Sequence, residues 1–169
     1  MSGFKLGRTA KEREALLRGL ASQLLWYGKI KTTEGKAKAL QPYVEKIITK
    51  AVNTFDDNVE IEVVKKDSKG NDMTVKSRKD GVKKLAARRA IMAKTYDLQE
   101  IKAFSESKKA YADRTKDVQH PLIEKIFDEI APKYAQRAEE KGQGGGYTRI
   151  YNLGERKGDA AETVIIELV

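Results

Sequence analysis

Residues 9–33, TAKEREALLRGLASQLLWYGKIKTT, describe a capped helix that leads directly into a strand. Thr9 and Glu12 have the spacing of a capping box, in which each side chain accepts a hydrogen bond from the other residue's backbone N–H. Gly28 suits a C-cap, because glycine enters the left-handed conformation at little cost. We therefore predict a helix over residues 10–27. Its buried side repeats at helical spacing through Leu16, Leu17, Leu20, Ala21, Leu24 and Leu25.

The opposite side of this helix carries small residues between cations. Two interpretations stay open for it: a surface that approaches a phosphate strand closely, or an ordinary solvated face. The residues on this side are Lys11, Ala15, Arg18, Gly19, Ser22 and Trp26.

The β-branched segment Lys29–Thr33 predicts a strand, and Thr33 is placed to cap a second helix over about 34–53. Pro42 lies inside that helix, and the missing N–H predicts a kink or a split near Leu40. The buried stripe expected for this helix consists of Ala37, Leu40, Val44, Ile47, Ile48 and Ala51.

In the middle of the chain, apolar and charged residues first alternate as in a strand, and a helical pattern then returns. Residues 59–76 predict a β-hairpin with a turn at 67–72, and 97–117 a weak, polar helical stretch. Asp80 is placed to cap a third helix over about 81–94. The apolar positions of that helix are Val82, Leu85, Ala86 and Ile91.

The last third contains one more helix and two strands. Pro121 suits the first turn of the helix, and Pro132 is expected to end or bend it. A polar, glycine-rich loop at 139–146 precedes strands at 147–153 and 163–169, the last apolar enough to be central in a sheet or covered on both faces. The helical stripe is Leu122, Ile123, Ile126, Phe127 and Ile130.

Composition limits the chemistry. The chain has 169 residues, no Cys and one His, so disulfides and thiolate metal sites are excluded. His120 has no second His or Cys to complete a ligand set, and a structural role is favoured for it. Gly144–Gly146 precedes a strand and lacks the Gly-Lys-Ser/Thr of a phosphate loop. We predict one domain, no enzyme activity, no small-molecule substrate, no cofactor and no metal, and we see no secretory signal or membrane span.

Positive charge is concentrated at the start of the chain. The net charge is +7 over residues 1–50, +4 over 51–120 and −2 over 121–169. A basic block of this size favours a polyanion, and nucleic acid is the obvious one. An anionic membrane is disfavoured as the binding partner, because the apolar sides of the predicted helices are expected to be buried in a core. Tyr147, Tyr151 and Trp26 are suited to base stacking or to core packing, with core as the default.

The cations recur on several predicted elements, and Arg suits phosphate because its planar fork bonds two oxygens at once. Together with the hydroxyls of two threonines they predict contacts to an RNA backbone more than to particular bases. The candidate RNA-binding residues are Lys5, Arg8, Lys11, Arg13, Arg18, Lys31, Thr32, Thr33, Lys36, Lys38, Arg88, Arg89, Gly145, Gly146, Tyr147 and Arg149.

Several motifs in one order resemble the bacterial large-subunit ribosomal protein of the L-seventeen family. The resemblance covers most of residues 5–53 and 118–169. It departs at the start, where the family's basic stretch is replaced by Met1–Phe4. The matching motifs are Lys5-Leu6-Gly7-Arg8-Thr9, Ile30-Lys31-Thr32-Thr33, Ala87-Arg88-Arg89, Ile130-Ala131-Pro132-Lys133-Tyr134, Gly145-Gly146-Tyr147-Thr148-Arg149-Ile150 and Gly158-Asp159-Ala160-Ala161.

The resemblance implies an α+β fold in two layers, with helices on one side of a small mixed β-sheet and an inserted β-hairpin. It also implies a structural constituent of the large (50S) subunit of the cytoplasmic ribosome. The protein would bind 23S rRNA near the mouth of the peptide exit tunnel, beside a small protein of the L-thirty-two family. Residues 58–80 and about 100–115 look like insertions, and the hairpin is expected to project.

Three alternatives remain: a free cytosolic RNA-binding or assembly factor, an enzyme or chaperone-like factor, and a general DNA-binding protein. An enzyme needs a pocket with convergent polar groups, and the sequence shows no candidate set for one. A DNA-binding protein needs a groove-reading helix or dimer symmetry, and the sequence shows no sign of either. We expect the exchange of Arg88 and Arg89 for alanine to weaken RNA binding without unfolding the domain.

Overall fold

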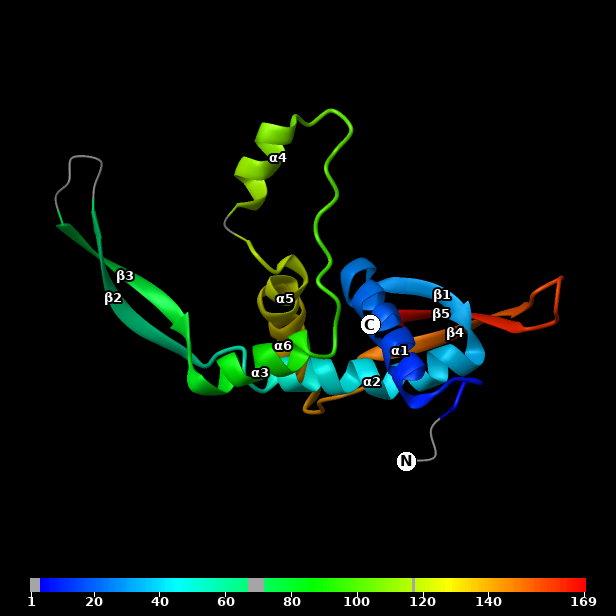
Figure 1. Cartoon of the computed structure of the whole chain (residues 1–169). Helices are drawn as coiled ribbons and strands as arrows, with labels where there is room; N and C mark the ends of the chain where they lie inside the picture. Colours follow the sequence, from blue (N-terminus) through cyan, green and yellow to red (C-terminus); the bar gives the residue numbers. More distant parts are fainter. Residues whose placement is uncertain (1–3, 67–71, 117) are drawn as a thin grey trace.

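The computed structural model describes residues 4–66, 72–116 and 118–169. Helices pack on one side of a small sheet, while a hairpin that begins at Asn58 and ends at Asp80 and the segment that leads to Pro121 extend away from this core (Figure 1). The elements are α1 Ala10–Tyr27, β1 Lys29–Thr33, α2 Glu34–Val52, β2 Asn58–Lys66, β3 Asp72–Asp80, α3 Val82–Met92, α4 Lys108–Thr115, α5 Pro121–Lys125, the π-helical turn η1 Ile126–Ile130, α6 Ala131–Lys141, β4 Thr148–Glu155 and β5 Glu162–Leu168.

The first helix and strand have the predicted bounds, and both caps of α1 are confirmed. The Thr9 hydroxyl accepts from the Glu12 N–H, and the Glu12 carboxylate accepts from the Thr9 N–H at 2.9 Å. The bond from the Thr9 N–H and, second, the bond that the Thr9 hydroxyl donates to the same carboxylate lower the pKa of Glu12. Gly28 ends the helix with φ 77°, and its N–H donates to the Leu24 carbonyl.

Helix α2 is the central helix of the core. All six residues of its predicted stripe are buried, and they share one interior with Leu24, Leu25 and the 121–131 helix. Thr33 is the N-cap residue, but its side chain makes no capping hydrogen bond. The sequence predicts a kink or a split near Leu40, and the split is wrong, because α2 runs unbroken from Glu34 to Val52. Pro42 is exposed, so the carbonyl that it leaves without a donor lies on the solvent side of the helix.

The sheet has the strand order β1-β5-β4, which confirms the α+β class and the central place of the last strand. Both neighbours of β5 run antiparallel to it, so the mixed sheet that the resemblance implied is wrong in this detail. A short turn joins β4 to β5, and such a connection requires antiparallel strands. Ile30, Ile166 and Ile150 form one row of the inner face, which α1 and α2 cover.

The helix that begins at Pro121 continues to Lys141, so Pro132 does not end it. A π-helical turn over Ile126–Ile130 precedes the proline, and the Ala131 N–H donates to the Ile126 carbonyl. A π-turn shifts the hydrogen-bond ladder by one residue, which lets the helix continue past a residue without an N–H. The expected loop at 139–146 therefore starts later, at Gly142 (φ 63°).

Helix α3 differs most from its prediction. Its N-cap is Gly81 rather than Asp80, and the Asp57 carboxylate accepts from the backbone N–H groups of Lys83 and Lys84. A side chain at position 81 would overlap this carboxylate. The buried side is Lys84, Ala87 and Ile91, whereas Val82, Leu85 and Ala86 are exposed. Of the predicted apolar positions only Ile91 is buried, so α3 packs on the core through a different side from the predicted one.

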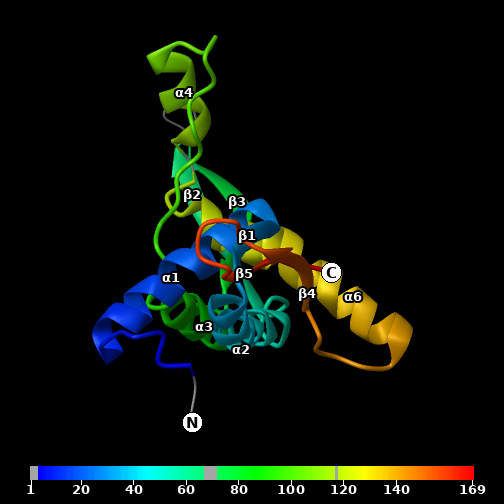
Figure 2. The same ribbon diagram turned by 90° about the vertical axis from the view of Figure 1, so that its right-hand side faces the viewer.

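Two segments project from the core. The β2–β3 hairpin confirms the predicted strand pair, and the expected turn at 67–72 lies mainly outside the described residues. Residues 97–107 are not helical, and only Lys108–Thr115 forms the helix expected over 97–117. In both views α4 stands apart from the other helices (Figure 2). No described helix is long and apolar enough to cross a membrane.

We predict that Ile166→Ala lowers the free energy of unfolding by about 3 kcal/mol, because it opens a cavity at the centre of the sheet. Ile166 is fully buried, whereas Ile101 is 81% exposed and serves as the control. Urea denaturation followed by circular dichroism measures both variants. We expect Ile101→Ala to stay within about 0.5 kcal/mol of the wild type, and equal losses in the two variants would contradict the described core.

Candidate nucleic-acid interface

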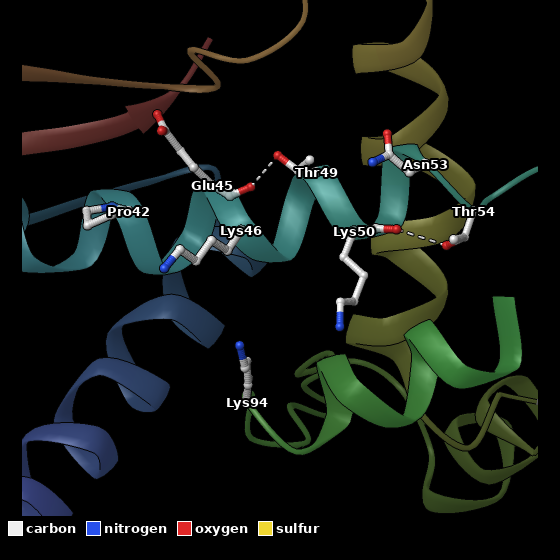
Figure 3. Close-up of a pocket in the computed structure, with 8 residues that line it drawn as sticks. All are labelled: Pro42, Glu45, Lys46, Thr49, Lys50, Asn53, Thr54 and Lys94. Carbon is white, nitrogen blue, oxygen red and sulfur yellow. Dashed lines mark hydrogen bonds between the residues drawn. The ribbon is translucent and has the colours of Figure 1, made fainter. Parts of the chain in front are cut away.

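A basic groove lies between α1, α2 and the segment that follows α3. Two adjoining pockets share Pro42, Lys46 and Lys94, so they form one continuous depression. Figure 3 shows Lys46, Lys50 and Lys94 extending into the space between α2 and the end of α3. The six cations that line the groove are Lys5, Arg13, Lys38, Lys46, Lys50 and Lys94.

The groove holds little compensating negative charge. Glu45 lines one of its two pockets, but its carboxylate accepts from the Thr148 hydroxyl at 2.9 Å and points toward the strands (Figure 3). Lys38 pairs with Glu34 at 2.6 Å, which lowers the pKa of Glu34. The other five cations face the same groove, and cations gathered in a groove attract a polyanion because their fields add there. The groove therefore suits a phosphate backbone.

The RNA-binding residues predicted from the sequence include Lys5, Arg13 and Lys38 of this groove but not its other three cations. A signal existed for two of them, since Lys38, Pro42, Lys46 and Lys50 recur every four residues and so share one side of α2. No local signal indicated Lys94. It joins the groove because the Tyr43 hydroxyl donates to its carbonyl at 3.0 Å.

A second group of predicted residues gathers at the edge of the sheet. Lys31, Thr32, Thr33 and Lys36 line a common pocket with Arg156. Arg156 is itself bonded to Asp159, and this contact holds the pKa of the Asp159 carboxyl at about 2. The predicted cations Arg8 and Lys11 are exposed, near the start of α1.

Arg149 is exposed on the outer face of the sheet. Its β5 partner in the register is Glu167, and the exposed Tyr151 follows two residues later on the same face. A hydrogen bond with the Tyr151 side chain is the main cause of the raised pKa of Arg149. Cationic and aromatic side chains thus lie together on an open sheet face.

The small-residue side of α1 is covered around Arg18 and Ser22, so the interpretation as an open phosphate surface is wrong there, whereas Lys11 and Ala15 are exposed. Ser22 is buried and accepts a hydrogen bond from the Tyr96 N–H at 2.7 Å. Arg18 donates to the Thr95 carbonyl at 3.2 Å, and its guanidinium lies 4.7 Å from the centre of the Tyr96 ring. The small residues admit residues 95–96 instead of RNA.

Arg88, a predicted phosphate ligand, is used inside the protein. It bonds the Glu124 carboxylate through both terminal nitrogens, at 2.6 and 2.9 Å, and contacts Asp80 through Nε. The Glu124 bond is the main cause of its raised pKa. The side chain is 18% exposed and lies over the Phe127 ring. Arg89, by contrast, is exposed.

The glycine segment is held from within by Arg137. Its guanidinium donates to the carbonyls of Gly145 and Gly146, and it lies over the rings of Tyr134 and Tyr147. Both glycines have positive φ, at 95° and 59°. Tyr147 is 4% exposed, so base stacking by its ring is ruled out in this structure and the core alternative holds.

His120 contacts Asp97 at 3.2 Å, a link between the start of α5 and the segment after α3. Within the described residues, no three His, Cys, Asp or Glu side chains gather in a way that suits a metal ion.

We predict that Arg88→Ala destabilises the fold by roughly 3 kcal/mol, since it leaves Asp80 and Glu124 without their shared cation. This bears on the expectation that the exchange of Arg88 and Arg89 weakens RNA binding without unfolding the domain, because the stability cost should come from Arg88. Arg89→Ala is the matched control and should change the free energy of unfolding by less than about 0.5 kcal/mol. Thermal denaturation of the two single variants tests this, and similar midpoints would contradict a structural role for Arg88.

Comparison with known proteins identifies the family of this chain. The family model described as Ribosomal protein L17 matches residues 16–169. Proteins named large ribosomal subunit protein bL17 are 40% identical in Acetivibrio thermocellus, 41% in Lachnospira eligens and 35% in Listeria welshimeri. Each match covers 98% of this chain and 97% of the relative. A chain matched at this identity over nearly its whole length belongs to the L17 family of ribosomal proteins.

Proposed function

We propose that the basic groove binds the phosphate backbone of 23S rRNA and so anchors the chain in the large subunit of the cytoplasmic ribosome. Membership of the L17 family makes the chain a structural constituent of the large ribosomal subunit and not an enzyme. The observation that carries the RNA proposal is the meeting of six cations from separate parts of the chain in one groove. Lys and Arg in such an arrangement release the counterions of a nucleic acid.

The predicted site residues divide into two groups. We propose that the first group contacts phosphates together with the groove lysines Lys46, Lys50 and Lys94. This group consists of Lys5, Arg8, Lys11, Arg13, Lys38 and Arg89, of Lys31, Thr32, Thr33 and Lys36 at the edge of the sheet, and of Arg149 on its outer face. The second group consists of Arg18, Arg88, Gly145, Gly146 and Tyr147. Their contacts within the protein support a structural role, which positions the first group.

We also propose the site that the resemblance implies, near the mouth of the peptide exit tunnel and beside a protein of the L-thirty-two family. The exposed apolar side of α3 supports a protein neighbour. Val82 is 86% exposed and, with Leu85 and Met92, falls on one side of the helix. An exposed apolar stripe on a small basic protein is typical of a protein interface.

Sedimentation separates this proposal from a free RNA-binding or assembly factor. A cell lysate is sedimented through a sucrose gradient at low and at high salt, and the chain is detected in each fraction. A ribosomal constituent co-migrates with the large subunit in both conditions. Recovery at the top of the gradient in both would overturn the proposal.

We predict that exchanging Lys46, Lys50 and Lys94 together for alanine weakens the binding of 23S rRNA fragments. A plot of log affinity against log salt has a negative slope. The magnitude of this slope should decrease by about 2 to 3, since each lost phosphate contact removes nearly one unit. Filter binding at several salt concentrations measures this slope.

The control exchanges Lys108, Lys109 and Lys116 for alanine, three exposed cations on or next to α4. Both triple variants lose the same charge, so a general electrostatic effect would decrease the magnitude of the slope equally in the two variants. That result would contradict a localised binding groove.

A further inference from the structure

One half of the basic groove has an apolar floor. Leu17 and Tyr43 are partly buried against the core, and Phe4 is 49% exposed beside them. Cations surround this floor, and no carboxylate lines this half within the described part of the chain. The floor consists of Phe4, Leu17, Ala39, Pro42 and Tyr43, and the rim of Lys5, Arg13, Lys38, Lys46 and Lys94.

The floor is built from elements that hold one another in place. Leu17 belongs to α1, while Ala39, Pro42 and Tyr43 belong to α2, and the two helices pack together. The Tyr43 hydroxyl donates to the Lys94 carbonyl, which fixes the segment after α3 as one side of the groove. Burial raises the pKa of Tyr43, so the hydroxyl keeps its proton and stays a donor.

The combination of an apolar floor and a cationic rim selects among anions. Double-stranded RNA presents phosphates and sugars on the outside and keeps its bases stacked inside, so it offers nothing flat to an apolar floor. An acidic peptide brings charge, but it brings a planar ring only where it carries an aromatic side chain. An unpaired nucleotide brings both a flat base and its flanking phosphates, and base stacking on aromatic side chains tolerates any sequence.

We propose that this half of the groove binds a single unpaired nucleotide of RNA. The base lies on the floor beside Phe4, Pro42 and Tyr43, and the flanking phosphates contact Lys46 and Lys94. This inference rests on the proposed RNA-binding function and deepens it, because it names the form of RNA that this part of the groove accepts.

The test compares two RNA probes on the purified full-length chain. One is a 10-nucleotide single strand of mixed sequence, and the other is the same strand annealed to its complement. Phe4→Ala should weaken binding of the single strand about tenfold, in the range of one lost base stack, and change duplex binding by less than about twofold. Phe4→Trp keeps an aromatic ring at this position, so it should bind the single strand about as tightly as the wild type does.

Phe104→Ala is the matched control, since Phe104 is also exposed, belongs to the segment between α3 and α4 and does not line the groove. It should leave both affinities unchanged. Both phenylalanines lie outside the buried core, and circular dichroism of the variants checks that the fold is kept.

The outcomes are distinguishable. If the wild-type chain binds neither probe, the RNA-binding function itself fails. If the wild type binds both but Phe4→Ala affects neither, or both equally, the groove holds phosphates only and the nucleotide site is overturned. A poly-glutamate peptide that competes with the single strand and loses affinity in Phe4→Ala would assign the groove to an acidic protein segment instead.

Discussion

Every layer of this molecule depends on the burial of one side of α2. This helix contacts α1, α3, the helix through η1 and α6, and all three strands of the sheet. Its buried residues repeat at helical spacing from Ala37 to Ala51, so the hydrophobic effect fixes how α2 is rotated about its axis. That rotation also decides the opposite side, where Pro42, Lys46 and Lys50 face the groove. The core and the candidate interface are thus two sides of one helix.

Several arginines bond to groups within the protein, which limits how much of the positive charge is available to bind RNA. Arg18, Arg88 and Arg137 each lie over an aromatic ring and donate to a carbonyl or carboxylate within the chain. A planar guanidinium is suited to this role, because it stacks on rings and bonds several oxygens at once. The lysines that line the groove are different, since an ammonium on a flexible stem reaches outward to a solvated phosphate. A net charge of +9 therefore does not translate directly into phosphate contacts.

Predictions from local signals were confirmed where one segment contains the whole signal. The capping box at Thr9, the C-cap at Gly28 and the stripe of α2 depend on residues a few positions apart. Predictions failed where a distant residue competes. Asp57 caps α3 in place of the adjacent Asp80, and Tyr96 covers the small-residue side of α1. Neither partner is visible in a local pattern. The pairing of β2 with β3 brings Asp57 beside the start of α3, and packing on α1 brings Tyr96 to Ser22.

The sequence by itself determined the order and nature of most elements, the α+β class, the basic character and the resemblance to a ribosomal family. Periodicity and capping are written in neighbouring residues, which is why they can be read without coordinates. The tertiary structure alone decided which cations remain outside the core. Arg88 lies among acids from β3 and α5, while Lys94 is brought to Lys46 by the Tyr43 bond. A side chain's availability depends on what packs beside it, and packing joins residues that are far apart in the chain.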